Sequence, residues 1–374
     1  MSERHGMMGF SEEQAALLES AARFCAEKSP IATVRRLIED DTGYDPAVFA
    51  EMGELGWLGV AIPEAFGGSG LGLAEVVPLA EQAGRRLLAT PLVSTTLAAQ
   101  ALLAAGTEEQ KSRVLPELAA GTPATVALAE PHGDFSPLPV DCRATRQGDE
   151  LELAGTKVLV LDAAAARWAV VSVSFEGSAA LVLLDADALA ASAPVRESVM
   201  DETRRAYRIR LDGVRVPAAA LLSGGDPAAA LSRIELAGAL LAAAEMCGAG
   251  FSCVDYTVEY LTTRKQFGRP IGSYQALKHP TVEAHLGMEQ ARSHLYAAAH
   301  SFEQEGEGEI AVRMAKAQVG PALGFAADRS IQFHGGFGFT YECDAQLYRR
   351  YAIFGETRFG DARYQRERLA ELIL

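Results

Sequence analysis

The pattern of hydrophobic and polar residues changes twice along the chain. Before Ala124, apolar side chains recur at the spacing of amphipathic helices. Two capping boxes, Ser11-Glu-Glu-Gln14 and Thr107-Glu-Glu-Gln110, each stand just before an Ala/Leu-rich run, as expected at the start of a helix. From Ala124 to Leu211, the apolar residues fall instead in short β-type runs separated by Gly, Asp and Pro turns. These runs are 126–128, 151–153, 158–161, 169–173, 180–184 and 207–211.

Helical spacing returns after Asp226. Leu240 to Tyr260 is apolar or small at helical spacing and contains no proline, which predicts one long helix. Gly268, Pro270 and Gly272 then break the pattern, and it resumes at Tyr274. The Ala-rich faces of these helices suit close packing in a bundle.

This order of elements predicts an α+β chain with three domains. The first, 1–123, is helical, the second, 124–224, is a small β-barrel or sandwich, and the third, 225–374, is a four-helix bundle.

Composition limits the possible partners. The chain has 374 residues, 49% of them hydrophobic, and a mean hydropathy of +0.07, which is typical of a globular protein. No apolar run of membrane-spanning length is evident, and Met1-Ser-Glu-Arg-His5 lacks a leader pattern, so we expect a cytoplasmic protein with no membrane partner. A net charge of −15 argues against nucleic acid, although a local arginine cluster can still bind an anionic cofactor.

The cysteines predict neither disulfides nor a metal site. They are scattered, odd in number and contain no Cys-x-x-Cys, so buried free thiols in a reducing compartment are expected. The five are Cys25, Cys142, Cys247, Cys253 and Cys343.

Two stretches in the last third are candidates for cofactor binding. Arg264-Lys-Gln-Phe-Gly-Arg-Pro-Ile-Gly272 joins two predicted helices. An arginine at such a turn, beside the free N–H groups of a helix start, can hold phosphate by a forked, charge-assisted contact. On spacing alone, the alternative is that Arg264 is an ordinary arginine at a solvated helix end. The second stretch is Gln332-Phe-His-Gly-Gly-Phe-Gly-Phe-Thr340.

These two stretches, in this order, resemble the C-terminal signatures of the acyl-CoA dehydrogenase family. The resemblance implies a flavoprotein that binds FAD and converts an acyl-CoA thioester to the enoyl-CoA. In that family a carboxylate takes the α-proton and the flavin takes the β-hydride, and the electrons usually pass to an electron-transferring flavoprotein.

The resemblance also implies that both signatures bind FAD across a subunit boundary. The residues at the pyrophosphate would be Arg264, Gln266 and Phe267. Those at the adenosine side would be Gln332, Gly335 and Gly336, where glycine lets the backbone approach closely. His334, in the same turn, is expected to be a structural hydrogen-bonding residue rather than a catalyst.

The sequence departs from the family where the flavin ring of the subunit's own FAD would lie. The family's Thr-Glu-Pro becomes Ala129-Glu-Pro131, and its Trp-Ile-Thr-Asn becomes Leu159-Val-Leu-Asp162. Both threonine hydroxyls are therefore lost, which removes two hydrogen bonds worth roughly 1 kcal/mol each.

The catalytic carboxylate is also missing from its usual places. The common base position falls on Arg358, and the alternative, used by the isovaleryl-type branch, falls on Gly238. We predict Glu245 as the base, because a lone carboxylate among alanines on a buried helix is costly unless it has a role. Glu235 and Glu356 are the alternatives for the base, and a buried ion pair with an arginine is the structural alternative for Glu245.

Three functions stay open at this stage. The chain is a self-sufficient acyl-CoA dehydrogenase working as a homodimer or homotetramer, or one subunit of a mixed tetramer that completes the FAD site of a homologous partner. In the third alternative the same fold serves as a flavin monooxygenase or a scaffold.

Overall fold

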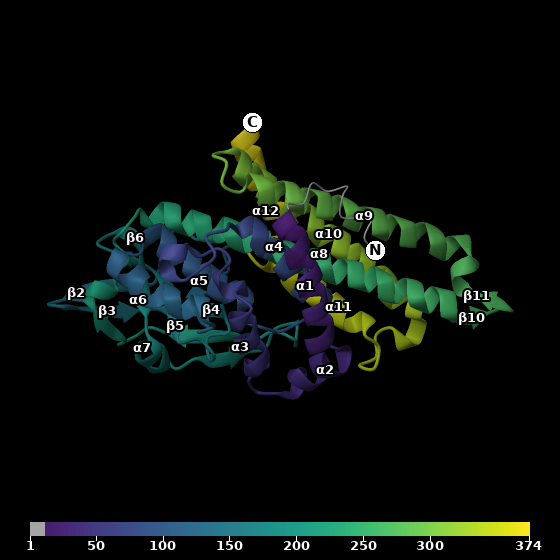
Figure 1. Ribbon diagram of the computed structural model, residues 1–374, viewed down its shortest axis with the longest axis horizontal. Helices are drawn as coiled ribbons and strands as arrows, with labels where there is room; N and C mark the ends of the chain where they lie inside the picture. The colour runs from purple at the N-terminus through teal and green to yellow at the C-terminus, as the bar shows by residue number, and fades with distance from the viewer. Residues whose placement is uncertain (1–11) are drawn as a thin grey trace. The chain divides into compact units, whose positions relative to one another are not determined.

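The structure, a computed structural model, describes residues 12–374 (Figure 1), so the predicted capping box at Ser11 lies outside the described residues. The first part of the described chain is helical, as predicted. Its helices are α1 (Glu12–Lys28), α2 (Ile31–Glu39), α3 (Pro46–Glu54), α4 (Leu73–Arg85), α5 (Leu92–Ala105) and α6 (Glu108–Ala119).

The capping box at the start of α6 is present. The Thr107 hydroxyl accepts a hydrogen bond from the Gln110 backbone N–H at 3.2 Å, and the Gln110 side chain accepts one from the Thr107 N–H at 2.9 Å. Each side chain thus satisfies a backbone donor that the helix itself leaves unpaired.

The middle of the chain forms two sheets. A six-stranded sheet has the order β1-β5-β2-β3-β9, with β6 paired to β5, and a three-stranded sheet has the order β4-β8-β7. The strands are β1 (Ala124–Ala127), β2 (Arg143–Gln147), β3 (Glu150–Ala154), β4 (Thr156–Leu161), β5 (Trp168–Phe175), β6 (Ser178–Leu184), β7 (Val195–Glu197), β8 (Ala206–Arg210) and β9 (Arg215–Pro217).

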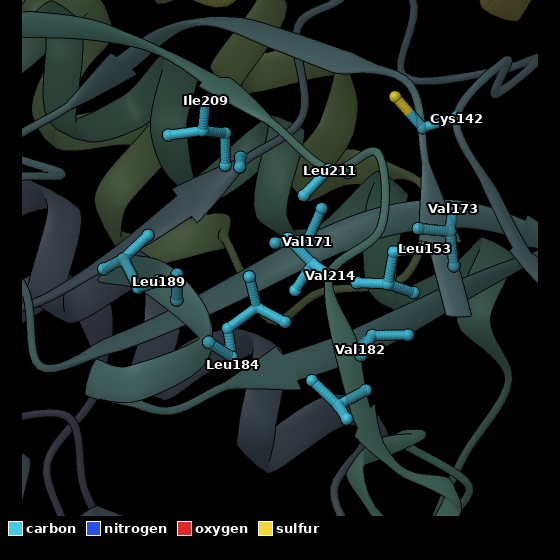
Figure 2. Close-up of a cluster of buried hydrophobic side chains, with 14 of the residues drawn as sticks. Cys142, Leu153, Val171, Val173, Val182, Leu184, Leu189, Ile209, Leu211 and Val214 are labelled. Carbon is cyan, nitrogen blue, oxygen red and sulfur yellow. The ribbon is translucent and has the colours of Figure 1, made fainter. Parts of the chain in front are cut away.

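Buried aliphatic side chains from these strands form one core, shown in Figure 2. Val171 and Val173 on β5 lie in it with Val182 and Leu184 on β6. The short helix α7 (Ala186–Ala191) adds Leu189, which gives the strands a covered face. Every one of the six predicted β-runs overlaps an observed strand.

The last part of the described chain is helical and contains the predicted bundle. The helices are α8 (Pro227–Thr263), α9 (Gln275–Ser301), α10 (Glu307–His334), α11 (Ala345–Thr357) and α12 (Ala362–Ile373). Helix α10 packs against α9, α11 and α12. Together with the central curled sheet, these helices confirm the predicted α+β fold class. All five cysteines are buried free thiols.

Helix α8 corrects one sequence-level expectation. It has 37 residues, and its most apolar window, with a mean hydropathy of 1.5, is long and apolar enough to cross a membrane. Yet 94% of that window is buried inside the protein, and the core helix of a soluble protein passes the same test. Alanine and glycine make up 12 of its 37 residues, and such small residues suit a helix packed closely inside a protein.

The described residues group into two compact units. One contains the chain up to Arg36, 74–88 and 239–374, and the other contains 37–73 and 89–238. Helix α4 thus belongs to the same unit as most of the C-terminal helices. The reason lies at Gly84 on α4 and Gly248 on α8, where a Cβ on either residue would collide with the backbone of the other helix. The division into domains 1–123, 124–224 and 225–374 stays a prediction.

Candidate functional site

The Arg264 turn is a short β-hairpin. Strand β10 (Lys265–Gln266) pairs antiparallel with β11 (Arg269–Pro270), and the two residues between them, Phe267 and Gly268, have φ of +52° and +79°. A two-residue hairpin loop with both φ values positive follows the right-handed twist of its strands. Sequence reasoning predicted the turn but not the strands, because each has only two residues and carries no periodic signal.

The tip of this hairpin is exposed. Phe267 is 91% exposed although it is a large aromatic in a left-handed conformation, which a side chain rarely adopts. Arg264 and Gln266 are exposed as well. The described residues offer the Arg264 guanidinium no hydrogen bond or ion pair. These side chains are therefore available to a molecule outside this chain.

The second signature forms the end of α10 and the turn after it. Gly335 has φ of +63°, which accounts for glycine at that position. Gly336 has no such backbone requirement, and a Cβ on it would meet open space in the described structure. A glycine that this chain's own packing does not require fits a position where an external group approaches the backbone closely. Gln332, one turn earlier, is exposed.

An aromatic stack brings the two signatures together. His334 is buried between Tyr256 and Tyr260 of α8, with ring centroids 4.9 Å and 4.1 Å away. The Tyr260 carbonyl accepts a hydrogen bond from the Arg264 N–H, so the hairpin begins one turn beyond this stack. His334 Nδ1 lies 2.8 Å from the Ser330 carbonyl oxygen, and burial lowers the pKa of its imidazole. This packing matches the structural role expected for His334.

These features fit FAD. The exposed guanidinium can bind a phosphate group, and the Gly335-Gly336 backbone is open to the close approach of another molecule. The individual FAD contacts of Arg264, Gln266, Phe267, Gln332, Gly335 and Gly336 stay predictions.

Glu245 faces Arg358, the residue on which the predicted base position falls. Arg358 is the first residue after α11, and its Nη1 lies 2.6 Å from Glu245 Oε2 in the middle of α8. Both side chains are buried, at 6% exposed for Glu245 and 8% for Arg358. On the same helices, Gly355 packs directly against Met246, which brings the end of α11 close to α8.

Lys316 of α10 holds the turn that carries Arg358. Its ammonium group is fully buried and donates hydrogen bonds to the carbonyls of Glu356, Gly360 and Gly355 at 2.8, 3.0 and 3.3 Å. Burial lowers the pKa of Lys316 to about 7. Sequence reasoning missed this residue, although a lone lysine in Met314-Ala-Lys-Ala317 was a usable signal.

The alternative carboxylates lie elsewhere. Glu356, near the end of α11, is half-buried, and its side chain lies beside Gly320 of α10. Glu235 is buried on α8 in the part of that helix that belongs to the other compact unit. Of the three predicted candidates, Glu245 lies in a buried ion pair with Arg358.

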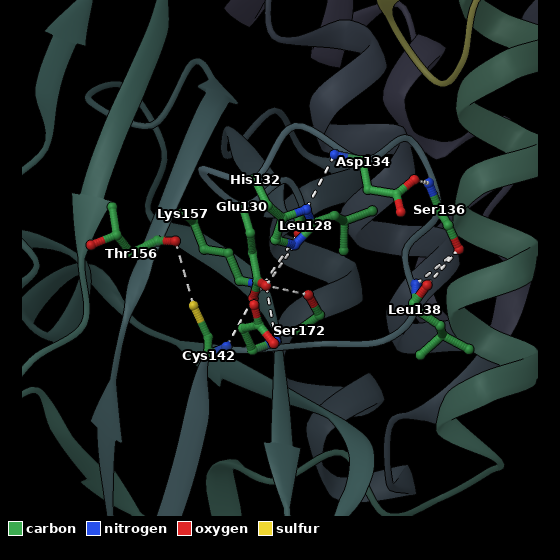
Figure 3. Close-up of polar contacts among 11 residues, drawn as sticks. Leu128, Glu130, His132, Asp134, Ser136, Leu138, Cys142, Thr156, Lys157 and Ser172 are labelled. Carbon is green, nitrogen blue, oxygen red and sulfur yellow. Dashed lines mark hydrogen bonds and ion pairs between the residues drawn. The ribbon is translucent and has the colours of Figure 1, made fainter. Parts of the chain in front are cut away.

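The two segments that would hold the subunit's own flavin ring are joined by a buried ion pair (Figure 3). Lys157 Nζ on β4 lies 2.7 Å from Glu130 Oε1, and it also donates to Ser172 Oγ and the Leu128 carbonyl. Beside this ion pair, the Val158 N–H donates a hydrogen bond to the Ala129 carbonyl. The segments are thus held in register although neither carries the family's threonine.

Both carboxylate oxygens of Glu130 accept hydrogen bonds. Oε1 accepts from Lys157 and the Cys142 N–H, and Oε2 accepts from the Asp141 N–H and lies 3.3 Å from His132 Nε2. Burial alone would raise the pKa of Glu130, but these hydrogen bonds and the Lys157 charge lower it to about 2. Although Glu130, His132 and Asp141 have potential ligand atoms within 4.8 Å of one another, the adjacent ammonium group makes this cluster an internal network rather than a cation site.

Comparisons with known proteins identify the family. Residues 11–122 match the profile of the acyl-CoA dehydrogenase N-terminal domain, and residues 230–374 match that of the acyl-CoA dehydrogenase C-terminal domain. Acyl-CoA dehydrogenase IpdE2 of Mycolicibacterium smegmatis is 30% identical over 364 residues, covering 96% of this chain and 98% of that protein.

Solved structures share the whole fold. A Tcur3481-Tcur3483 steroid ACAD variant is 29% identical with a TM-score of 0.86, covering 97% of this chain and 98% of that one. The ChsE4-ChsE5 complex of Mycobacterium tuberculosis, 24% identical, has a TM-score of 0.88 over 97% of this chain and 98% of that one. This chain belongs to the acyl-CoA dehydrogenase family of FAD-dependent oxidoreductases, which dehydrogenate acyl-CoA thioesters.

Proposed function

We propose that this chain is one subunit of a mixed acyl-CoA dehydrogenase. In this assembly it completes the FAD site of a homologous partner, and the partner supplies the catalytic base. The observation that carries the proposal is the ion pair between Arg358, at the family's base position, and Glu245.

The ion pair is a poor starting point for base catalysis. A general base must present a carboxylate that can take a proton from the acyl-CoA α-carbon. If Glu245 took a proton, the buried guanidinium of Arg358 would lose its compensating charge, and such uncompensated charges are strongly destabilising. The contact that allows Glu245 to be buried therefore opposes its use as a base.

The two halves of the predicted FAD site also differ. Arg264 and the glycines of the second signature are exposed and have the residue types that the family uses across a subunit boundary. Ala129 and Leu161, in contrast, offer no hydroxyl to the flavin of this chain. A related steroid ACAD, 29% identical, is named for two proteins, Tcur3481 and Tcur3483. This name supports a mixed assembly here.

FAD, when bound, accepts the hydride from the substrate. Within such an assembly, Arg264 would neutralise the pyrophosphate of the partner's FAD, while Gly335 and Gly336 would let the backbone approach its adenosine side. We expect the electrons to pass to an electron-transferring flavoprotein in the cytoplasm. Because a related structure is a steroid ACAD, a bulky ring-bearing acyl-CoA is the first substrate to test.

A second candidate is a self-sufficient dehydrogenase in which Glu245 is the base. It is favoured by the burial of Glu245 in the middle of α8, where a carboxylate without a role would be costly. In this alternative the enzyme is a homo-oligomer, and Arg358 must leave the carboxylate when substrate binds.

The test is to purify the tagged chain from its native host and to measure which proteins co-purify with it and how much FAD the purified complex contains. We expect a homologous chain in equal amount, one FAD per pair, and bleaching of the flavin by acyl-CoA without oxygen. Replacing the partner's carboxylate should abolish bleaching, while Glu245→Gln should leave bleaching per folded molecule near normal. A homo-oligomer with one FAD per chain, in which Glu245→Gln binds acyl-CoA but loses bleaching about 10²–10⁴-fold, would overturn the proposal.

A further inference from the structure

We infer that Arg35 is a positioning residue for the second FAD signature. It clamps the loop that follows Gln332–Thr340 and so fixes the exposed turn that faces the cofactor. This inference rests on the proposed function, because it assigns the turn to FAD binding, but it concerns a residue on α2, far away in the sequence.

The clamp uses most of the guanidinium group. Arg35 Nη1 donates to the Tyr341 carbonyl at 2.5 Å, and Nη2 donates to the Glu342 carbonyl at 3.1 Å. Nε and Nη2 both donate to Asp344 Oδ1, at 3.2 and 2.5 Å. A planar fork that binds two carbonyls and a carboxylate fixes direction as well as distance, which a lysine cannot do.

Asp344 shows that the loop is arranged for this contact. It is the N-cap residue of α11, where an aspartate usually accepts a hydrogen bond from the first turn of its own helix. Here its side chain makes no such bond to α11 and instead pairs with Arg35. The carboxylate thus joins the loop to α2 rather than capping its own helix.

The turn needs an external anchor because it has little burial of its own. Phe339 and Tyr341 are 73% and 51% exposed, so the hydrophobic effect does not hold them in place. On one side the loop is fixed at Gly335 by the stack around His334, and on the other by buried Cys343, whose sulfur lies 3.6 Å from the Tyr256 hydroxyl. Arg35 binds the backbone carbonyls of Tyr341 and Glu342 between these points and the Asp344 carboxylate just beyond them. The Tyr341 ring itself lies 5.0 Å from the Arg350 guanidinium.

The neighbouring arginine supplies a matched control. Arg36 follows Arg35 on α2, is exposed, and makes no side-chain contact within the described part of the chain that resembles the clamp. Arg35→Ala and Arg36→Ala therefore make the same chemical change on the same helix. Arg35→Lys keeps the charge and removes the fork, and Asp344→Asn provides a second way to weaken the clamp if Arg35→Ala does not fold.

Two measurements on the assembled protein test the inference. Amide hydrogen exchange over residues 335–344 reports on the loop, and the rate of FAD loss during dialysis reports on the cofactor. In Arg35→Ala we expect exchange in 339–344 and FAD loss each to rise about tenfold or more, the effect of losing charge-assisted hydrogen bonds. Arg35→Lys should fall in between, and Arg36→Ala should match wild type in both.

The outcomes are separable from those of the proposed function. Unchanged exchange in Arg35→Ala overturns the clamp, and faster exchange with normal FAD retention overturns its role in positioning the cofactor. Arg264→Ala is measured in parallel, because it tests the trans FAD site without touching the loop. If Arg264→Ala also keeps its FAD, the proposed function fails, whereas loss of FAD in Arg264→Ala but not in Arg35→Ala overturns this inference alone.

Discussion

Glu245 can be buried on α8 because Arg358 compensates its charge from the end of α11. Gly355 packs against the Met246 side chain beside this contact, and a Cβ at position 355 would lie 3.0 Å from the Met246 Cγ. At the scale of single residues, the predicted base Glu245 is thus part of an internal ion pair.

Removing one partner of this pair should be costly. Glu245→Gln leaves the Arg358 guanidinium buried without a counter-charge, so we expect a loss of roughly 3–5 kcal/mol in the free energy of unfolding. Chemical denaturation at neutral pH measures it. Glu259→Gln, an exposed change on the same helix, is the control and should cost little. A Glu245→Gln variant as stable as wild type would show that the ion pair is not what permits burial.

Sequence reasoning reached part of this picture. A lone carboxylate in the Ala-rich run around Glu245 pointed to either a base or an ion pair with an arginine. It could not name the arginine, because the two residues are 113 positions apart and meet only through the packing of α8 and α11. The role of Arg35 could not be predicted for the same reason, because its hydrogen-bond acceptors lie far along the chain at 341–344.

At the scale of elements, the Glu130–Lys157 pair holds the start of the strand β4 against the segment that follows β1. Lys157 is fully buried and finds three acceptors for its three protons, so the ammonium group is well satisfied. The network fixes the spacing of two segments whose own sequences have diverged from the family pattern.

This pair should make stability depend on pH in the acid range. The pKa of Glu130 is lowered from 4.5 to about 2 in the folded state, so the ionised form is favoured by folding. Its contribution is complete above the unfolded pKa and is lost as pH falls from about 4.5 toward 2. Between pH 6 and pH 3 this amounts to about 2 kcal/mol of unfolding free energy.

Urea unfolding of wild type and Glu130→Gln at several pH values isolates this effect. The stability difference between them should shrink by that amount as pH falls from 6 to 3. Glu150→Gln, an exposed change on β3, should keep a constant difference from wild type. A difference for Glu130→Gln that does not change with pH would mean that Lys157 does not hold the carboxylate ionised.

Strands were predictable where their side chains alternate or form apolar runs. The fully buried part of β5 stands out for this reason, whereas β2 buries only Ala144 of its five residues and gives no pattern. The strands β7 and β9 have three residues each, and the hairpin strands β10 and β11 have two. Such short pairings depend on neighbouring strands and turns rather than on local sequence.

At the scale of the whole molecule, the order of helices, strands and helices was readable from periodicity, but the grouping of elements was not. Helix α4 joins the C-terminal helices through Gly84 and Gly248, two glycines whose pairing no local pattern reveals. The exposed signatures are the other feature of this scale. Arg264 is exposed, and Phe267 is 91% exposed although its ring lies edge-on to Tyr274.

If two chains clamp each FAD, cofactor binding and assembly must be linked by mass action. Diluting the assembly through its dissociation range should release FAD in parallel with loss of the oligomer, and added free FAD should shift both transitions to lower protein concentration. Sedimentation velocity with detection at the flavin absorbance follows the two events in one experiment. Arg264→Ala should uncouple them, with FAD released before the oligomer dissociates, because the phosphate contact is lost while the rest of the interface remains. A wild-type monomer that keeps its FAD after dilution would contradict the shared site and would place the whole cofactor on one chain.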